Sequence, residues 1–158
     1  MSDAENTTPA AVADTPVRKR PKPGERRVQI LQALASMLEQ PGAERITTAA
    51  LAAKLEVSEA ALYRHFASKA PMFEGLIEFI EQAVFTLVGQ IAEREAAATD
   101  PAAGSRHAGK VVTMLLQFAE KNPGMVRVMV GDALVFENER LQQRMNQFFD
   151  KIEATLKQ

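Results

Sequence analysis

Apolar residues recur at helical spacing along most of the chain, and no stretch alternates between apolar and polar residues as a half-buried strand would. Residues 72–91 have the spacing of one long amphipathic helix of about five or six turns. A first helix is expected to end at Pro41-Gly42, and further helices are expected from Val111 and from about Ala133. The residues that recur at helical spacing in the first helix, or share one stripe of the last, are Val28, Ile30, Leu31, Leu34, Met37, Leu38, Leu141, Met145, Phe148, Ile152 and Leu156. The pattern therefore predicts an all-α fold.

Helix-breaking residues separate these elements. Residues 96–104 contain Thr, Asp, Pro and Gly and are expected to form a loop, with His107 solvated in the polar stretch beside it. Asn122-Pro123-Gly124 is expected to end one helix, with a short helical piece following through Val130. Glu137 and Arg140 are interpreted as a surface pair. The methionines at helical spacing are interpreted as core-filling residues: Met114, Met125, Met129 and Met145.

The most informative segment covers residues 46–69, with the sequence ITTAALAAKLEVSEAALYRHFASK. Thr47 or Thr48 is suited to begin a short helix, because its hydroxyl can accept a hydrogen bond from a free backbone N–H. Glu56-Val57 is expected to make a tight turn, after which Ser58 caps a second short helix. The side chains expected to point inward are Leu51, Ala52, Leu55, Val57, Leu62 and Phe66. Two short helices joined by a tight turn predict a helix-turn-helix between residues 47 and 66.

Packing leaves one side of the second short helix free. Its outer surface is expected to carry Glu59, Ala60, Ala61, Tyr63, Arg64 and His65. Small side chains at two of these positions would let the helix sit deep in a major groove, while Tyr63 and His65 can donate to phosphates or base edges. Ser68 is expected to cap the next helix, which would place Lys69 at a phosphate site beside that helix's positive end. The alternative is an ordinary helical hairpin inside an all-α core.

The net charge of −1 conceals an uneven distribution. Residues 18–69 contain ten Lys and Arg against five Asp and Glu, whereas residues 74–100 contain one Arg against six acids. A basic front followed by an acidic segment is typical of a DNA-binding head on a body that does not bind DNA. Residues 1–23 have few bulky apolar side chains and are expected to be a disordered arm. The candidate DNA contacts on this arm are Arg18, Lys19 and Arg20, and a merely solubilising tail is the alternative.

Composition argues against several other classes of protein. The chain has no cysteine and two histidines, without a glycine-rich phosphate loop or an acidic cluster of metal-ligand spacing. We therefore expect neither an enzyme nor a metal or cofactor site. No apolar run approaches the roughly 20 residues of a membrane span, and no signal peptide is recognisable. The expectation is a soluble intracellular protein without a membrane partner.

The arrangement Leu62-Tyr63-x-His65-Phe66-x-x-Lys69 resembles the DNA-binding head of the TetR family of regulators. LIEFIE, EKNPG and the segment GDALVFENERLQQRMNQFFDKIEATL resemble the nucleoid occlusion factors of that family, and the resemblance covers roughly residues 25–158. It implies a homodimer that binds near-palindromic double-stranded DNA in the cytoplasm, at the nucleoid. It also implies that the DNA-bound protein antagonises assembly of the division protein FtsZ. No cofactor is implied.

The resemblance also implies roles for individual residues. Thr47 and Thr48 would meet phosphates, Ser58, Glu59, Ala60 and Ala61 would face the groove, and Tyr63, His65 and Lys69 would hold the backbone or base edges. For FtsZ the candidate contacts are Phe79, Lys121 and Asn122, although a core or interface role is an alternative for Phe79. Glu56 departs from the family by standing where a glycine is usual. If that position needs a positive φ, glutamate costs on the order of 1 kcal/mol and brings a carboxylate near DNA.

The expected organisation is an arm over residues 1–23, a helix-turn-helix domain over residues 24–69 and an incomplete helical domain over residues 70–158. The last helix has no stop signal before Gln158, so further helices that build the family's dimer interface are expected beyond it. Two alternatives remain. A ligand-responsive repressor should enclose an apolar pocket with inward polar groups, and few such groups are expected here. A helical adaptor that never touches DNA would leave Tyr63, His65 and Lys69 without a role.

Overall fold

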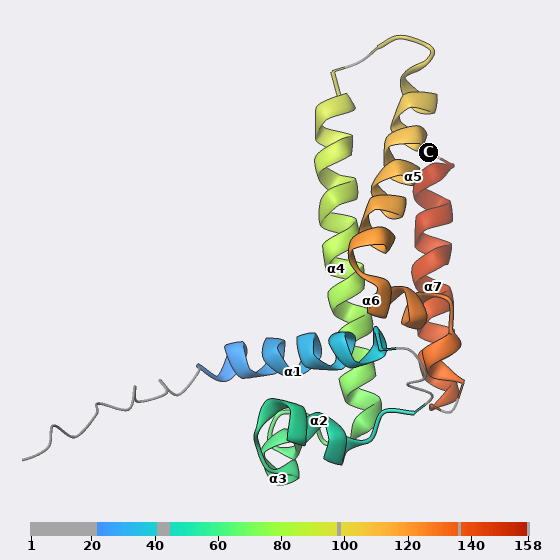
Figure 1. Ribbon diagram of the computed structural model, residues 1–158. Helices are drawn as coiled ribbons and strands as arrows, with labels where there is room; N and C mark the ends of the chain where they lie inside the picture. The colour runs from blue at the N-terminus through green and yellow to red at the C-terminus, as the bar shows by residue number, and fades with distance from the viewer. Residues whose placement is uncertain (1–21, 41–44, 98, 136, 158) are drawn as a thin grey trace, which may run out of the picture.

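The computed structural model describes residues 22–40, 45–97, 99–135 and 137–157. In this part of the chain the structure is helical and contains no strand, so the predicted all-α class is confirmed (Figure 1). The elements are α1 (Pro23–Leu38), α2 (Thr48–Leu55), α3 (Glu59–Tyr63), α4 (Lys69–Glu95), α5 (Ala103–Lys121), α6 (Pro123–Met129), the 3-10 turn η1 (Asp132–Leu134) and α7 (Glu139–Leu156).

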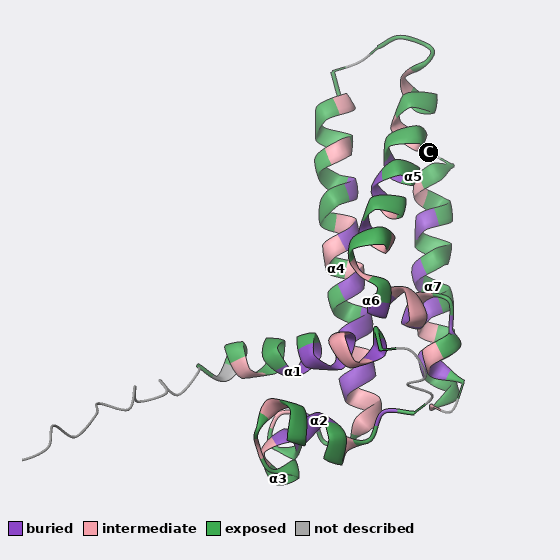
Figure 2. Ribbon diagram, in the orientation of Figure 1, coloured by how far each residue is buried: buried purple, intermediate pink, exposed green. Residues whose placement is uncertain are grey.

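The first three helices form a head at one end of the molecule, and α4 runs from that head along the whole body (Figure 1). In the body, α4 packs against both α5 and α7, and the buried residues lie where these helices face one another (Figure 2). Phe148 of α7 is fully buried and meets Phe85 of α4 edge-on, with 5.8 Å between ring centroids. The methionines predicted to fill the core do so: Met114, Met125 and Met145 are buried, and Met129 is partly buried against them.

Helix α4 is longer than the apolar pattern of residues 72–91 predicted, and it belongs to both parts of the fold. Its first turns bury Met72 and Phe73 against the head, and Ile80, Val84 and Val88 lie in the body. By length and composition α4 is apolar enough to cross a membrane, which corrects the expectation that no run approaches a span. Its buried stripe is nevertheless the central packing surface of this fold, as expected for a core helix.

The head and the body meet where α1 packs against α6. Gly124 in the first turn of α6 lies so close to α1 that a Cβ built there would be 2.0 Å from the carbonyl oxygen of Ala35. Next to this contact, the Arg127 guanidinium of α6 donates to the carbonyl oxygen of Leu38 at 3.0 Å, near the end of α1. Within the EKNPG sequence, α5 therefore ends at Lys121, Pro123 begins α6, and Gly124 lets α1 approach.

Two predicted helix boundaries are wrong. Helix α5 begins at Ala103, eight residues before Val111, so His107 lies in a helix and not in a polar loop. Asp100 makes this early beginning stable, because its carboxylate accepts from the Ala102 N–H at 2.9 Å and from both terminal nitrogens of Arg106 at 3.0 and 2.7 Å. The last helix begins at Glu139, where the Asn138 side chain caps it, and the residues just after Ala133 belong to η1 and a turn.

A row of ion pairs joins α4 to α7 along the solvent side. Arg140 pairs with Glu74 at 3.0 Å, Arg144 with Glu78 at 3.3 Å and Lys151 with Glu81 at 3.8 Å. The predicted pair of Arg140 with Glu137 is therefore wrong, because Arg140 pairs with Glu74 and Glu137 pairs with Lys69, the first residue of α4. Exposed pairs contribute little each, but oppositely charged rows at this spacing favour one register between the two helices.

Candidate nucleic-acid interface

Local capping determines the shape of the helix-turn-helix. Thr47, and not Thr48, is the N-cap of α2, and its hydroxyl accepts from the Ala50 N–H at 3.1 Å. Ser58 caps α3 in the same way, accepting from the Ala61 N–H at 3.2 Å. Between them, Glu56 adopts a left-handed conformation with φ 55° and ψ 42°, and α2 ends there. The turn therefore does require a positive φ at the position that glutamate occupies.

The two helices share a small apolar core with α1 and α4. Leu51, Ala52, Leu62 and Phe66 are buried, and Leu55 and Val57 pack partly buried against them, as the sequence predicted. The Arg27 guanidinium of α1 lies 4.5 Å from the centroid of the Phe66 ring, which joins α1 to the end of the motif by a cation–π contact. This support fixes α3 on a rigid base, with one side left to solvent.

The residues predicted to contact DNA are divided between exposed and partly buried positions. Thr47, Ser58, Glu59, Ala60, Tyr63 and Arg64 are exposed, whereas Thr48, Ala61, His65 and Lys69 are partly buried. Tyr63 and Thr48 are brought together, because the phenol oxygen lies 3.3 Å from the threonine hydroxyl as its hydrogen-bond donor. This bond ties the end of α3 to the start of α2 and places both hydroxyls on one surface.

Lys69 is placed differently from the sequence expectation. Ser68 does occupy the N-cap of α4, but its side chain makes no capping hydrogen bond. The Lys69 ammonium lies 2.6 Å from a carboxylate oxygen of Glu137 and 5.9 Å from the centroid of the Phe73 ring. A cation expected to hold a phosphate is therefore held by a carboxylate from the body of the protein.

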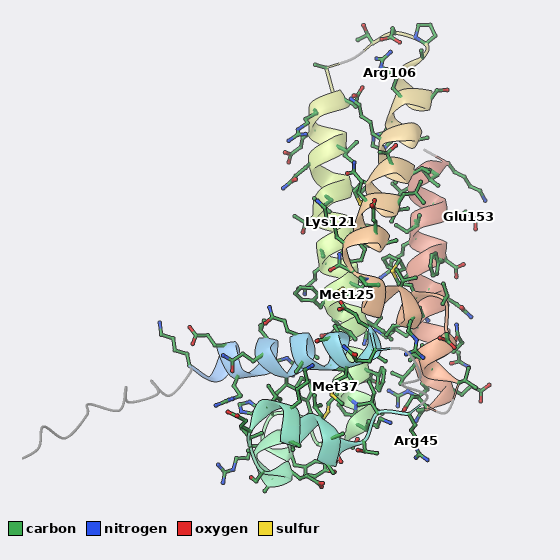
Figure 3. The ribbon with its side chains drawn as sticks, in the orientation of Figure 1. Met37, Arg45, Arg106, Lys121, Met125 and Glu153 are labelled. Atoms are coloured by element: carbon green, nitrogen blue, oxygen red, sulfur yellow. The ribbon has the colours of Figure 1, made fainter. Side chains whose placement is uncertain are left out.

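Sequence reasoning did not single out Arg45, a basic residue of the head. Arg45 is exposed and lies two residues before Thr47, at the approach to α2. Figure 3 shows its side chain directed outward at the edge of the head, on the side of α2. The signal in the sequence was a cation next to a helix N-cap, where a bound phosphate would also meet free backbone N–H groups. The arm contacts named from the sequence, Arg18, Lys19 and Arg20, lie outside the described residues.

The residues predicted to face FtsZ lie in the body. Phe79 is 37 % exposed on α4, and Lys121 and Asn122 are at the end of α5. Lys121 is exposed, while the Asn122 amide donates to the carbonyl oxygen of Phe118 at 2.8 Å. Figure 3 shows Lys121 on the body, away from Arg45 of the head.

An open groove of about 560 Å³ lies between α4 and α5. Leu87, Ile91 and Met114 form its apolar part, and Arg94, Arg106 and Lys110 add cationic groups. At its outer end, a hydrogen bond from the Lys110 ammonium lowers the pKa of Glu95, and one from the Arg106 guanidinium lowers the pKa of Asp100. Among the described residues, no polar or charged residue is buried.

Comparison with known proteins agrees with this arrangement. Residues 30–76 match the model of the tetR family of bacterial regulatory proteins, and these residues contain α2 and α3. Residues 106–158 match the SlmA-like model of the tetracyclin repressor-like C-terminal domain.

Curated relatives cover most of the chain. The nucleoid occlusion factor SlmA of Marinomonas sp. (strain MWYL1) is 55 % identical over 137 residues, which are 87 % of this chain and 66 % of that protein. The protein of the same name from Aliivibrio fischeri (strain MJ11) is 55 % identical over 139 residues, 87 % of this chain and 68 % of that protein. The one from Vibrio cholerae is 54 % identical over 134 residues, which are 84 % of this chain and 65 % of that protein. The resemblance stated from the sequence is confirmed, and the chain spans about two thirds of the length of these relatives.

Proposed function

Because the chain belongs to the nucleoid occlusion factor SlmA family, within the tetR family of bacterial regulatory proteins, we propose that it binds specific DNA sites and, when DNA-bound, inhibits assembly of FtsZ. Septum formation over the chromosome is thereby blocked. The protein acts at the nucleoid, as a homodimer on near-palindromic sites. In this proposal the head over residues 24–69 binds DNA and the helical part over residues 70–158 serves dimerisation and FtsZ.

One observation carries the DNA-binding part of the proposal. The capped helix α3 stands on a buried base of Leu62 and Phe66, and leaves Tyr63 and Arg64 exposed beside two alanines, Ala60 and Ala61. Small residues permit close approach to base edges, while the phenol and guanidinium are donors for phosphate oxygens or bases. Thr47, the exposed N-cap of α2, supplies a further hydroxyl for the DNA backbone, and Arg45 lies two residues before it in the chain.

A dimer would present two such surfaces to one duplex. Recognition helices of two-fold symmetric proteins reach successive major grooves when half-sites lie roughly 34 Å apart, one helical turn. We infer this spacing for the operator. The logarithm of the association constant should fall linearly with the logarithm of the salt concentration, with a slope of about −0.9 for each phosphate contact.

For FtsZ, the proposed surface is the side of the body that α4 and α5 share. Phe79 lies 8 and 15 residues before Leu87 and Arg94, at spacings that keep α4 side chains on one broad side of the helix. Lys121 continues the α5 row of Gln117, Met114 and Lys110 in the same way. The open groove between these rows offers an apolar floor with Arg94 on its border, while its other two cations, Arg106 and Lys110, are paired with Asp100 and Glu95. Such a groove suits an extended, mainly apolar segment of a partner.

A ligand-responsive repressor is less well supported. It needs an enclosed apolar pocket with a few inward polar groups, whereas the groove between α4 and α5 is open and the described core has no buried polar residue.

The test is FtsZ sedimentation with the full-length protein, with and without a selected palindromic duplex. We expect inhibition of polymerisation only when the duplex is present, and none with a Tyr63→Ala variant that no longer binds it. Phe79→Ala is the complementary variant: it should keep duplex binding and lose inhibition. Tight duplex binding without any effect on FtsZ polymer would instead indicate a repressor.

A further inference from the structure

The Lys69–Glu137 ion pair links the proposed DNA surface to the body. Lys69 is the first residue of α4, directly after the helix-turn-helix, and Glu137 lies two residues before α7. Their charged atoms are 2.6 Å apart, and the side chains are only 21 % and 11 % exposed. In contrast, the three glutamates that pair with α7 lie further along α4 and belong to the body.

This pair places a carboxylate where a phosphate is expected. Lys69 has three N–H donors and one positive charge, and it is partly buried, whereas Arg45 and Arg64 of the described head are exposed. A bound carboxylate neutralises that charge and repels a second anion at short range. A phosphate that contacts Lys69 must therefore either share the ammonium with Glu137 or displace it.

We propose that Glu137 is a positioning residue that competes with DNA phosphate for Lys69. In the free protein it holds Lys69 against the Phe73 ring, and in the complex the phosphate takes its place. The competition lowers the affinity for every duplex, specific or not, because a phosphate contact carries no sequence information. The competition also works in the other direction. If Glu137 weakens the binding of phosphate to Lys69, then bound phosphate weakens the Lys69–Glu137 pair, so the contact between the head and the residues before α7 depends on whether DNA is bound.

This inference rests on the proposed DNA-binding function, so its test must separate the two. We would titrate a labelled palindromic duplex with the full-length protein and measure fluorescence anisotropy over a series of salt concentrations. The key variant is Glu137→Gln, which keeps the size of the side chain and removes its charge. Glu81→Gln is the matched control, because it removes the same charge from the pair with Lys151 in the body.

We expect Glu137→Gln to bind the duplex about two- to fivefold more tightly than Glu81→Gln at low salt, the range that one partly exposed ion pair supports. The difference should fade as salt rises, because salt weakens the internal pair of the wild-type protein. In a Lys69→Gln background, Glu137→Gln should have no effect on affinity. Glu137→Asp, with a shorter side chain, should show the same gain in smaller measure, and it replaces the glutamine variant if that variant does not fold.

Equal affinities of the Glu137 and Glu81 variants would overturn the inference. Weaker binding by Glu137→Gln would also overturn it, because it would mean that Glu137 orients Lys69 towards phosphate. A gain in affinity that survives in the Lys69→Gln background would overturn it as well. The wild-type protein and Tyr63→Ala provide the separate test of the proposed function. If the wild-type protein binds no duplex at all, both fail; if it binds and only the Glu137 effect is missing, the inference alone is wrong.

Discussion

Replacing Gly124 with alanine should disrupt the joint between the head and the body. The new Cβ would lie 2.0 Å from the Ala35 carbonyl oxygen, 3.0 Å from the Ala35 carbonyl carbon and 3.1 Å from Cγ of Glu39. Ordinary van der Waals contacts of a Cβ begin at 3.4 Å, so α6 and α1 would have to separate by more than an ångström. The closest atom is backbone and cannot rotate out of the way.

Overpacking of this kind costs about 1–3 kcal/mol. Alanine returns roughly 0.5–1 kcal/mol through its better helix propensity, so the net loss should be at most about 2.5 kcal/mol. For a protein of this size, a loss of that size corresponds to a fall in Tm of up to roughly 10 °C. Urea unfolding followed by circular dichroism measures the change directly. Duplex binding should weaken as well, because α1 supports the helix-turn-helix.

Gly89→Ala is the control, because Gly89 is also inside a helix but has no atom within 4 Å of the position of a new Cβ. It should be neutral or raise stability by about 0.5–1 kcal/mol. If Gly124→Ala behaves like Gly89→Ala, the close approach of α1 and α6 is not as described, and the explanation given for the EKNPG sequence is wrong.

Three further predictions concern the turn, the cap and the charged end of the body. Glu56→Gly should raise the free energy of unfolding by up to about 1 kcal/mol, because glycine adopts the left-handed conformation without strain. A lower urea midpoint would show that the contacts of the Glu56 side chain stabilise the protein by more than its backbone strain costs. Thr47→Ala should cost about 1 kcal/mol of stability through loss of the α2 cap, and Thr47→Ser should restore it; equal urea midpoints for the two variants would contradict this. Because the Arg106 guanidinium lowers the pKa of Asp100 in the folded protein, the stabilisation is present at neutral pH and is lost as the pH falls through that lowered pKa. The difference in urea midpoint between wild type and Asp100→Asn should therefore shrink on acidification, and a constant difference would exclude a role for the charge.

The helix-turn-helix was predictable because local chemistry determines it. Thr47 and Ser58 have the side chains that cap helices, and Leu51, Leu62 and Phe66 recur at the spacing of an inward side. The identities of the exposed residues on α3 followed from the same periodicity. Thr47 was one of two candidates for the cap, and only the backbone geometry distinguishes it from Thr48.

Features that depend on contacts distant in sequence were not predictable in this way. The first turns of α5 lack an apolar stripe, and they are helical because Asp100 and Arg106 hold them at the N-terminal end. Glu137 was assigned to a neighbour three residues away, whereas its partner is Lys69, 68 positions earlier in the chain. Arg45 was overlooked because it lies before the first cap, outside both helices of the motif.

Duplex titration by fluorescence anisotropy tests whether the surface around α3 binds DNA. We predict that the full-length protein binds a selected palindromic duplex, and that the logarithm of its association constant falls with the logarithm of salt concentration at a slope of about −0.9 for each of several phosphate contacts. Tyr63→Ala should lose most of this affinity, and Lys121→Gln, which removes a cation from the body, should keep it. Equal losses in the two variants, or binding that is indifferent to salt, would contradict the assignment of this surface to DNA.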